Sequence, residues 1–262
     1  MTASPSSGLK TITAALLVIG DEILSGRTKD KNIGYIADYL TAVGIELREV
    51  RVVPDVEAEI IAAVNALRAR YTYLFTTGGI GPTHDDITSE SVAKALGLEV
   101  IEDPRAIALL LERLKPEDLN EARRRMARLP VGAELVQNSV SKAPGFKIEN
   151  VIVMAGVPRI MQAMLDDIVP RLETGAKMLM ETIEATGVPE GAYAAGLAAI
   201  AEAHPQLSIG SYPSLGDGRF RNEIVVRGKE SGEVAAAVAK IYAMLERVKA
   251  ERASAREQDR RA

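Results

Sequence analysis

The segment Tyr71–Asp86 reads "YTYLFTTGGIGPTHDD" and joins an apolar stretch to a glycine turn that ends in two adjacent carboxylates. Its first part, "YTYLFT", predicts a β-strand because it is short, is rich in aromatic and β-branched residues, and runs straight into the glycine turn. In an open parallel sheet, ligands bind beyond the carboxyl ends of the strands. The segment therefore predicts an α/β fold and the edge of the sheet that carries the site.

The residues around this segment alternate between strand and helix patterns, which is typical of a parallel sheet with helices on both faces. Before the segment, "AALLVIG" and "IELREVRVV" predict two strands, and after it "NVIVMA" predicts the last strand of the same sheet. Helices are predicted around Ile33–Val43, Ile60–Leu67, Thr88–Leu96, 104–115, 117–128 and the segment that follows Gly156. Together these elements predict a three-layer, parallel-sheet α/β domain over residues 11–174.

The chain changes character near Gly175. The remaining segments follow the order β-α-β-β-α, which predicts a small α+β module over residues 175–250, with helices on one face of an antiparallel sheet. Both ends of the chain are polar. Residues 1–10 are predicted to be a disordered N-terminus, and residues 251–262, "ERASAREQDRRA", a solvated tail.

Composition limits the classes of function. With no cysteine and two histidines, the chain cannot build a thiolate site or a multi-histidine zinc site, so any metal needs oxygen ligands. A net charge of -4, 4% aromatic residues and no tryptophan argue against a nucleic-acid surface. The first apolar run is too short to cross a membrane, and no cleavage pattern follows it. We therefore expect a cytoplasmic protein with a small-molecule partner.

The glycine turn suggests a phosphate site. Gly78, Gly79 and Gly81 allow positive φ and close backbone approach, so successive N–H groups can point at an anion, and Thr76 and Thr77 add hydroxyl donors. The turn is not a Walker P-loop, because no Gly-Lys-Ser/Thr follows, and His84 stands where a dinucleotide-binding loop has its third glycine. The same glycines are also compatible with a tight strand-to-helix turn that binds nothing.

The carboxylates beside the turn indicate a metal ion. A bare carboxylate about 4 Å from a phosphate costs roughly 1 kcal/mol per charge pair in water and about 4 kcal/mol at an effective dielectric of 20. A divalent cation between the two groups reverses the sign of the interaction. Mg²⁺ is usually held by one or two carboxylates plus phosphate oxygens of the substrate. Glycines and aspartates together therefore predict a metal–phosphate site.

Each candidate carboxylate also has an ordinary structural interpretation. Asp85 and Asp86 both precede a predicted helix, so either one could cap it, and we interpret Asp86 as the ligand. Glu22 follows the first strand and could be a polar turn residue, while Asp55 could cap the helix after the second strand. Because all of them stand at strand ends, we expect them to converge on one site.

The order of several motifs resembles a known family. "LLVIGDEILSGRTKDKN", "VPD", "TTGGIGPTHDDIT", "APGF" and "GVPRIM" occur in the order seen in the molybdopterin-binding domain family, most like its competence- and damage-inducible protein A branch. The resemblance covers about residues 12–172, and residues 176–250 resemble the small module that follows in that branch. It implies binding of terminal phosphates of a pterin or nucleotide. It also implies metal-dependent hydrolysis of nucleotide pyrophosphates such as ADP-ribose, with related activity on FAD.

The resemblance assigns roles to particular residues. It implies that Asp86, Asp55 and Glu22 are catalytic residues that hold a divalent metal ion, which is Mg²⁺, Mn²⁺ or Co²⁺. The residues implied in phosphate or substrate binding are Thr77, Gly78, Gly79, Gly81, Ser25, Asp30, Gly156 and Pro158. The chain departs from the family at Ser141, Lys142 and Ala155, where Gly-Thr and Pro are usual. Lys142 could add a phosphate contact or block part of the pocket.

Two functions remain after this comparison. The leading hypothesis is an enzyme that hydrolyses a nucleotide pyrophosphate with the help of a metal ion, and the alternative is a non-catalytic module that binds molybdopterin or a nucleotide. Longer members of the branch carry a C-terminal amidase domain, and we expect this chain to be a short form without it. The family commonly assembles, so a homo-oligomer, either a dimer or a trimer, is expected.

Overall fold

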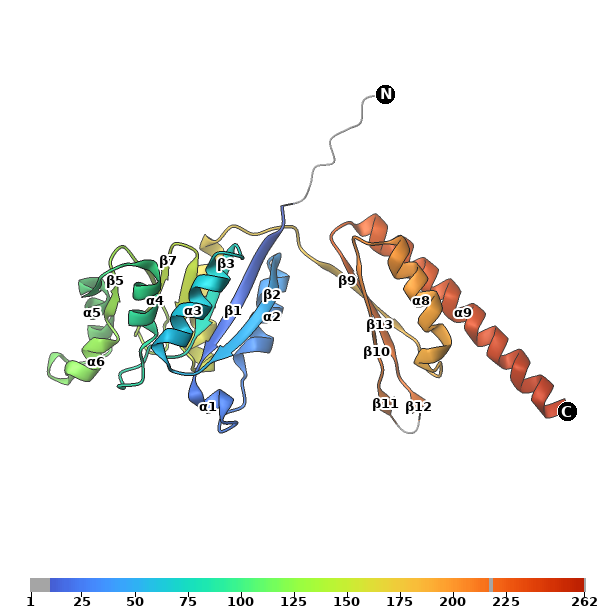
Figure 1. Ribbon diagram of the computed structural model, residues 1–262, viewed down its shortest axis with the longest axis horizontal. Coiled ribbons are helices and arrows are strands. Elements are labelled where there is room, and N and C mark those ends of the chain that lie inside the picture. Colours follow the sequence, from blue (N-terminus) through green and yellow to red (C-terminus); the bar gives the residue numbers. More distant parts are fainter. Residues whose placement is uncertain (1–9, 217–218, 262) are drawn as a thin grey trace, which may run out of the picture. The chain divides into compact units, whose positions relative to one another are not determined.

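The computed structural model describes residues 10–216 and 219–261. These residues form two compact units, Lys10–Gly175 and the part of the chain from Ala176 onward (Figure 1). The predicted disordered N-terminus lies outside the described residues except for Lys10. No helix among the described residues is long and apolar enough to cross a membrane.

The first unit is built on a six-stranded sheet in the order β2-β1-β3-β8-β7-β6. Its strands are β1 (Ile12–Ile19), β2 (Ile45–Val53), β3 (Tyr73–Thr77), β6 (Glu134–Val136), β7 (Gly145–Ile148) and β8 (Val151–Met154). The pairs among β2, β1, β3 and β8 are parallel, whereas β7 and β6 run antiparallel to their neighbours. The predicted α/β sheet is therefore confirmed, and its antiparallel edge was not anticipated.

Helices cover both faces of this sheet (Figure 1). They are α1 (Asp21–Leu24), α2 (Asn32–Ala42), α3 (Glu57–Arg68), α4 (Thr88–Leu96), α5 (Pro104–Leu111), α6 (Glu121–Arg125) and α7 (Pro158–Ile168), with 3-10 turns η1 (Pro116–Asp118) and η2 (Val169–Arg171). A separate two-stranded sheet pairs β4 (Val100–Glu102) with β5 (Arg128–Pro130).

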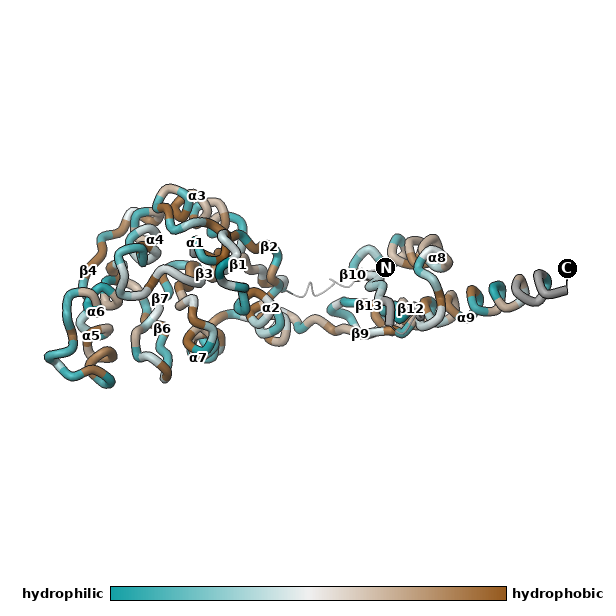
Figure 2. The backbone as a smooth tube through the Cα atoms, turned by 90° about the horizontal axis from the view of Figure 1, so that it is seen from below, coloured by the Kyte–Doolittle hydropathy of each residue, from teal (hydrophilic) through white to brown (hydrophobic). Residues whose placement is uncertain are grey.

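The alternation of side chains along β1 explains the three layers. Ala14, Leu16 and Val18 belong to a core that includes residues of α2 and α7. Ala15, Leu17 and Ile19 belong to a second core, which includes residues of α3, α4 and α5. Because successive side chains of a strand point to opposite faces, a continuous apolar run is what a strand buried on both faces requires. Several helices in Figure 2 alternate between hydrophilic and hydrophobic residues, as helices with one buried side do.

The predicted helices after β4 are too long. Helix α5 ends at Leu111 rather than near residue 115, and α6 covers only Glu121–Arg125 of the predicted 117–128. The start of α5 is capped by the Asp103 side chain, which accepts a hydrogen bond from the Arg105 N–H. The segment after α6 is taken up by β5, which pairs with β4. Tertiary pairing therefore overrides the local helical pattern.

The second unit has the predicted α+β order. Strands β9 (Leu179–Glu184), β10 (Ser208–Tyr212) and β13 (Glu223–Gly228) form an antiparallel sheet in the order β10-β13-β9. Helices α8 (Glu190–Ala203) and α9 (Ser231–Arg261) contribute to one apolar core with this sheet. A short hairpin pairs β11 (Leu215–Gly216) with β12 (Arg219–Phe220).

The solvated tail predicted over residues 251–262 is helical as far as Arg261, because α9 continues through it. Most of its side chains whose exposure the structure describes are exposed, Arg252 being half-buried.

Two glycine substitutions test the packing of the first unit. At Gly145 in β7, a Cβ atom would lie 2.2 Å from the Val153 carbonyl oxygen, so Gly145→Ala should lower the free energy of unfolding by about 1–3 kcal/mol. Gly34 is exposed in α2 and a Cβ there meets nothing within 4 Å, so Gly34→Ala should raise stability by up to about 1 kcal/mol. Urea titrations followed by circular dichroism measure both. Equal effects of the two alanines would contradict the close approach at Gly145.

Candidate functional site

The carboxyl ends of β1, β3 and β8 lie together at one edge of the parallel part of the sheet, as the registers of the strands require. The glycine turn after β3 is fixed to this edge. The Gly78 N–H donates to the Met154 carbonyl oxygen at 3.1 Å. The Thr88 hydroxyl at the start of α4 donates to the Gly78 carbonyl oxygen at 3.0 Å, and the Thr88 N–H to the Gly79 carbonyl oxygen at 3.0 Å.

Packing alone requires two of these glycines. Gly78 has a φ of 103°, and a Cβ atom there would lie 2.1 Å from the Ile19 carbonyl oxygen. Gly79 has a φ of 65°, and its Cβ would lie 2.1 Å from the Thr88 hydroxyl. Gly156 comes close to the same turn, because its Cβ would lie 3.3 Å from the Gly78 Cα. The structural interpretation of the turn is therefore satisfied whether or not it also contacts an anion.

A pocket of about 230 Å³ opens beside these strand ends. Its lining includes Glu22, Asp30, Thr77, Gly156 and Pro158, which are five of the residues predicted from the sequence. The other lining residues are Val18, Ile19, Ile23, Thr28, Lys29, Lys31 and Asn32. Sequence analysis assigned no role to Thr28, Lys29, Lys31 or Asn32, although all four stand within the "GRTKDKN" motif. Their position between a strand end and a helix start was the available signal.

Two buried polar atoms of this lining have no hydrogen-bond partner. They are the Thr77 Oγ1 and the Asn32 Oδ1, and the two residues are 1% and 5% exposed. The Asn32 Nδ2 donates to the Gly156 carbonyl oxygen at 2.8 Å, which fixes the orientation of the carboxamide. Buried polar atoms are nearly always paired in folded proteins, so these two are exceptions that call for a partner.

Asp30 organises the start of α2. Its Oδ1 accepts hydrogen bonds from the Asn32 N–H at 3.1 Å and the Ile33 N–H at 2.8 Å. These N–H groups belong to the first turn of the helix and have no partner within it. Asp30 therefore lines the pocket and also holds Asn32 in place.

The carboxylates of Asp55 and Glu22 belong to the same edge of the sheet. Asp55 does not cap α3, which has no side-chain cap; its Oδ2 accepts a hydrogen bond from the Asp21 N–H at 2.9 Å. Burial raises the pKa of Asp55, and the negative charges of Asp21, Glu22 and Asp85 raise it further, against the lowering effect of this hydrogen bond. Asp21, Glu22 and Asp55 form no ion pair with a described residue, and Asp85 is paired with His84 alone, so negative charge is in excess at this edge.

Asp86 lies in a different local environment. Its Oδ2 accepts hydrogen bonds from the Thr83 N–H at 2.8 Å and the Thr83 hydroxyl at 2.5 Å, and it lies close to Gly81. No side chain caps α4, so neither of the two adjacent aspartates has the predicted capping role. Residues predicted for the site that are not part of the pocket lining are Asp86, Asp55, Gly78, Gly79, Gly81 and Ser25. Among residues 10–216 and 219–261, no group of three or more acidic, histidine or cysteine side chains is placed to hold a metal ion.

Lys142 also lies outside the pocket lining. Its Nζ forms an ion pair with the Glu112 Oε2 at 2.6 Å, just after α5. The loop around it is fixed by Asn138, whose Oδ1 accepts from the Ser141 N–H at 2.7 Å and whose Nδ2 donates to the Ala143 carbonyl oxygen at 2.7 Å. In this arrangement the ammonium of Lys142 is paired with Glu112, and its contact with a phosphate stays a prediction.

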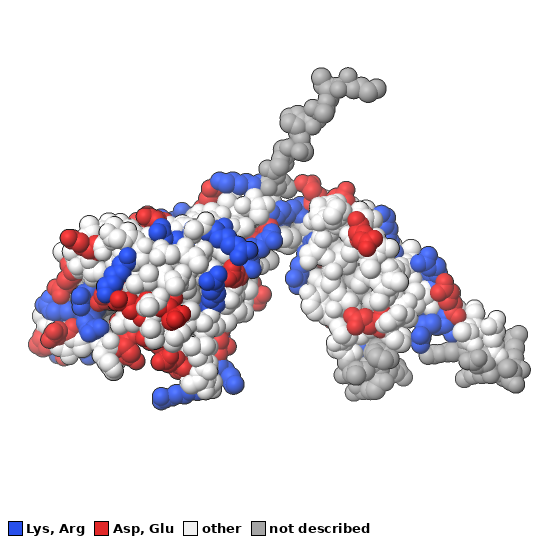
Figure 3. All heavy atoms as spheres, viewed as in Figure 1, with Lys and Arg blue, Asp and Glu red and all other residues white. Residues whose placement is uncertain are grey.

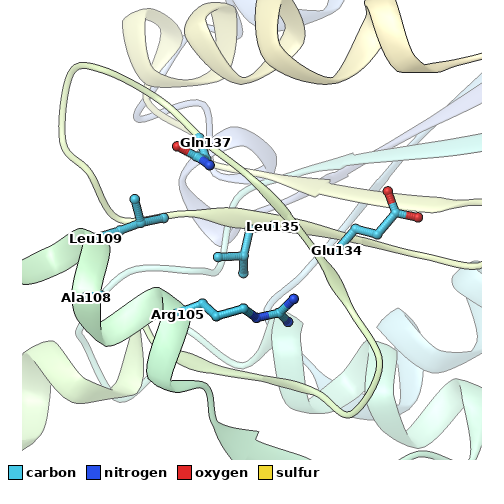
Figure 4. A pocket seen from close by; sticks show the side chains of 6 residues that line it. All are labelled: Arg105, Ala108, Leu109, Glu134, Leu135 and Gln137. Carbon is cyan, nitrogen blue, oxygen red and sulfur yellow. The ribbon is translucent and has the colours of Figure 1, made fainter.

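A larger hollow of about 520 Å³ lies between α5 and β6 (Figure 4). Its two charged side chains already have partners within the chain, and its other polar side chain, Gln137, is exposed. Arg105 is bonded to Asp103 and to the Ala133 carbonyl oxygen, and Glu134 is paired with Lys147. None of the predicted site residues lines it. The pocket at the strand ends is the better candidate site because it contains unpaired polar groups.

Charge is unevenly distributed on the first unit. In the view of Figure 3, acidic atoms lie along its lower edge, and basic side chains project beyond them. Lys29 and Lys31 of the pocket lining are exposed. An anionic ligand could therefore approach the pocket past cationic side chains.

Comparisons with known proteins agree with this picture. Residues 15–174 match the family described as a probable molybdopterin binding domain, and residues 177–253 match the middle domain of FAD synthase. A protein of Pyrobaculum calidifontis is 34% identical over 211 residues, which are 77% of this chain and 80% of that protein. A CinA-like protein of Desulfosudis oleivorans is 36% identical over 75% of this chain, which spans 51% of its length.

Among solved structures, the protein CinA with unknown function from Thermoplasma acidophilum is 33% identical with a TM-score of 0.58. The match covers 61% of this chain and 96% of that one.

A lysine substitution tests the position of the 138–146 loop. Because Lys142 is paired with Glu112, Lys142→Thr should change the dissociation constant of ADP-ribose by less than twofold at both low and high salt. Lys29→Thr, in the pocket lining, should weaken the same ligand about two- to fivefold, and less at high salt. Calorimetric titration measures both constants. Weaker binding by the Lys142 variant alone would show that the loop closes over the ligand.

The raised pKa of Asp55 predicts a pH-dependent stability effect. Folding favours the protonated form of this carboxyl. The free energy of unfolding of the wild type therefore falls as the pH rises from the ordinary aspartate pKa of 3.8 through the raised pKa of Asp55. Asp55→Asn keeps an acceptor for the Asp21 N–H and removes that loss.

The Asp55 variant should therefore be more stable than wild type at neutral pH, and the difference should vanish below the ordinary aspartate pKa of 3.8. Urea midpoints measured at both pH values test this. Asp38→Asn on the exposed side of α2 is the control for a simple change of net charge. A loss of stability at neutral pH would contradict the prediction.

Proposed function

The chain belongs to the molybdopterin-binding domain family, in its CinA-type branch, and we propose that its strand-end pocket binds the phosphate-bearing end of a nucleotide or pterin. The observation that carries this proposal is the buried, unpaired Thr77 hydroxyl in the pocket lining. A hydroxyl can donate to a phosphate oxygen, which satisfies a group that otherwise has no partner.

The surroundings of Thr77 suit an anion. Thr77 ends β3 and is followed by a glycine turn whose backbone can come close to a ligand. Lys29 and Lys31 supply positive charge at the same pocket. With a volume of about 230 Å³, the pocket is smaller than the range of roughly 300–1,000 Å³ that holds a whole drug-sized ligand. It is therefore suited to one phosphate-bearing group of a larger molecule.

We further propose that the bound molecule is a nucleotide pyrophosphate, such as ADP-ribose or FAD, and that the chain hydrolyses it with a divalent metal ion. The supporting observation is the uncompensated acidic edge around Asp55. Mg²⁺ needs only one or two carboxylates when the substrate supplies further oxygens, so a complete three-residue group is not required. Asp55 and Glu22 are the residues that would hold the ion.

Different residues of the pocket would have different roles in binding and hydrolysis. Thr77 and the lysines bind and orient the phosphate, and the aliphatic side chains of Val18, Ile19 and Ile23 restrict the entry of water into the pocket. Asp55 and Glu22 would hold a divalent ion at the acidic edge, and such an ion would polarise a phosphoryl oxygen and neutralise developing negative charge. Asp86 supports the turn through Thr83 and has no assigned contact with the reacting group.

A non-catalytic binding module is the second candidate. It is favoured by the lack, within the part of the chain that the structure describes, of a group of three or more metal-binding side chains. It is also favoured by the pairing of Lys142 with Glu112, which leaves the pocket without that additional cation. The two candidates share the pocket and differ in whether a pyrophosphate bond is broken.

An activity panel separates the two candidates. ADP-ribose, FAD and NADH are incubated with Mg²⁺, Mn²⁺ or Co²⁺, and release of mononucleotide is followed by chromatography. We expect turnover of at least one substrate, and Asp55→Asn should lower it by at least about tenfold, because even residues that only support the ligands of a metal ion typically affect activity 10- to 100-fold. Asp38→Asn, which removes the same charge from an exposed position of α2, should retain full activity.

Ligand affinity is measured on the same samples without metal. Binding without turnover for every substrate and metal would reject hydrolysis and leave the binding module. Absence of both binding and turnover would reject the proposed pocket.

A further inference from the structure

The carboxamide of Asn32 presents a hydrogen-bond acceptor that a phosphate cannot satisfy. Asn32 is 5% exposed and lines the pocket, and its Oδ1 has no partner. Phosphate oxygens are also acceptors. A bare phosphate beside the Asn32 Oδ1 would therefore leave this atom unpaired and bring two acceptors together. A ligand group that pairs directly with this atom offers an N–H or O–H at this position.

The orientation of the carboxamide is fixed by its other contact. The Nδ2 donates to the Gly156 carbonyl oxygen at 2.8 Å, and the reverse orientation would bring two oxygen acceptors together. The backbone of Asn32 is also held, because its N–H donates to the Asp30 Oδ1 at 3.1 Å. The acceptor therefore stays where it is, and the ligand has to match it.

The neighbouring side chains indicate what kind of donor fits. Two carboxylate residues, Glu22 and Asp30, line the same pocket, and carboxylates accept hydrogen bonds from sugar hydroxyls. Among the described residues that line the pocket, none has an aromatic side chain on which a flat ring could stack, since the apolar ones are Val18, Ile19, Ile23 and Pro158. The combination favours a hydroxylated, non-aromatic group.

From these observations, and resting on the proposed binding of phosphate, we infer that Asn32 is a specificity-determining residue that selects a sugar phosphate through a hydroxyl group. In this assignment, Thr77 donates to the phosphate and the Asn32 Oδ1 accepts from a sugar hydroxyl. The pocket then distinguishes a ribosyl phosphate from a phosphate that carries no hydroxyl. The volume of about 230 Å³ accommodates a group of this size.

The test compares two ligands and three proteins. Ribose 5-phosphate and methyl phosphate, which has no hydroxyl on its carbon, are titrated calorimetrically into wild type, Asn32→Leu and Thr77→Val. The leucine is close in size to asparagine and removes the acceptor, and the valine keeps the shape of threonine and removes the hydroxyl. Wild type should prefer ribose 5-phosphate by about two- to tenfold, the range expected for a single hydrogen bond.

Each variant should give a different pattern. Asn32→Leu should bring the two affinities together by weakening ribose 5-phosphate alone, whereas Thr77→Val should weaken both ligands and keep their ratio. Unchanged affinity for methyl phosphate also shows that the Asn32 variant is folded. If leucine impairs folding, as judged by circular dichroism, Asn32→Ala replaces it with the same expected pattern.

The outcomes separate this inference from the proposed function. If neither phosphate binds to wild type, the proposed pocket fails. If both bind but the ratio is the same in wild type and Asn32→Leu, phosphate binding stands and the role of Asn32 is rejected.

A third ligand, 6-hydroxymethylpterin phosphate, tests the source of the donor. The assignment to a sugar hydroxyl would be overturned if wild type bound this pterin more tightly than ribose 5-phosphate and Asn32→Leu removed that preference.

Discussion

The site depends on the contact between Gly78 and the carbonyl oxygen of Ile19. Any side chain at Gly78 would place a carbon 2.1 Å from that oxygen, so the turn after β3 can lie against the end of β1 only with glycine there. The same residue donates its N–H to Met154 at the end of β8 and lies against Gly156. Three strand ends are thereby drawn together, and the pocket lined by Thr77, Asn32 and Gly156 lies beside them. A glycine requirement that looks like a ligand contact in the sequence is first of all a packing requirement.

The polar groups without partners at this edge are the reason for choosing it as the candidate site. Thr77 and Asn32 each bury a polar atom without a partner, and an unpaired buried group typically costs about 1–3 kcal/mol. Asp55 adds a carboxylate whose pKa is raised by burial and by its acidic neighbours. Other polar groups of the first unit are paired, as Asp103 is with Arg105 and Asn150 with the carbonyl oxygens of Arg68 and Tyr71. Thr76, Ser91 and Arg125 also bury an atom without a partner, and Thr77 and Asn32 differ from them because they line the pocket.

Much of the fold could be predicted from the sequence because its main elements are locally specified. The bounds of β2 and α4 follow directly from an apolar strand pattern and from a helix ended by Gly97, whose φ is 68°. The strands β6 and β7 have only three and four residues, and they exist because they pair with each other and with β8. The candidate site likewise combines features that the local sequence specifies with features that only tertiary contacts specify. Thr77 and Glu22 could be placed at strand ends from the sequence, whereas the pairing of Lys142 with Glu112 and of Asp55 with the Asp21 N–H joins residues far apart in the chain.

The separation of these carboxylates changes how the glycine turn and its acidic neighbours are understood. The sequence places Asp85 and Asp86 beside the glycines, and their charge next to a phosphate is the original reason to expect a cation. In the structure, Asp86 accepts two hydrogen bonds from Thr83, which stabilise its charge locally. The carboxylates without such compensation are those around Asp55, which reach the site from the end of β2 and from α1. If a metal ion takes part, its requirement comes from Asp55 and the acidic residues around it, which include Asp85 of the glycine turn, whereas Asp86 shapes the turn through Thr83.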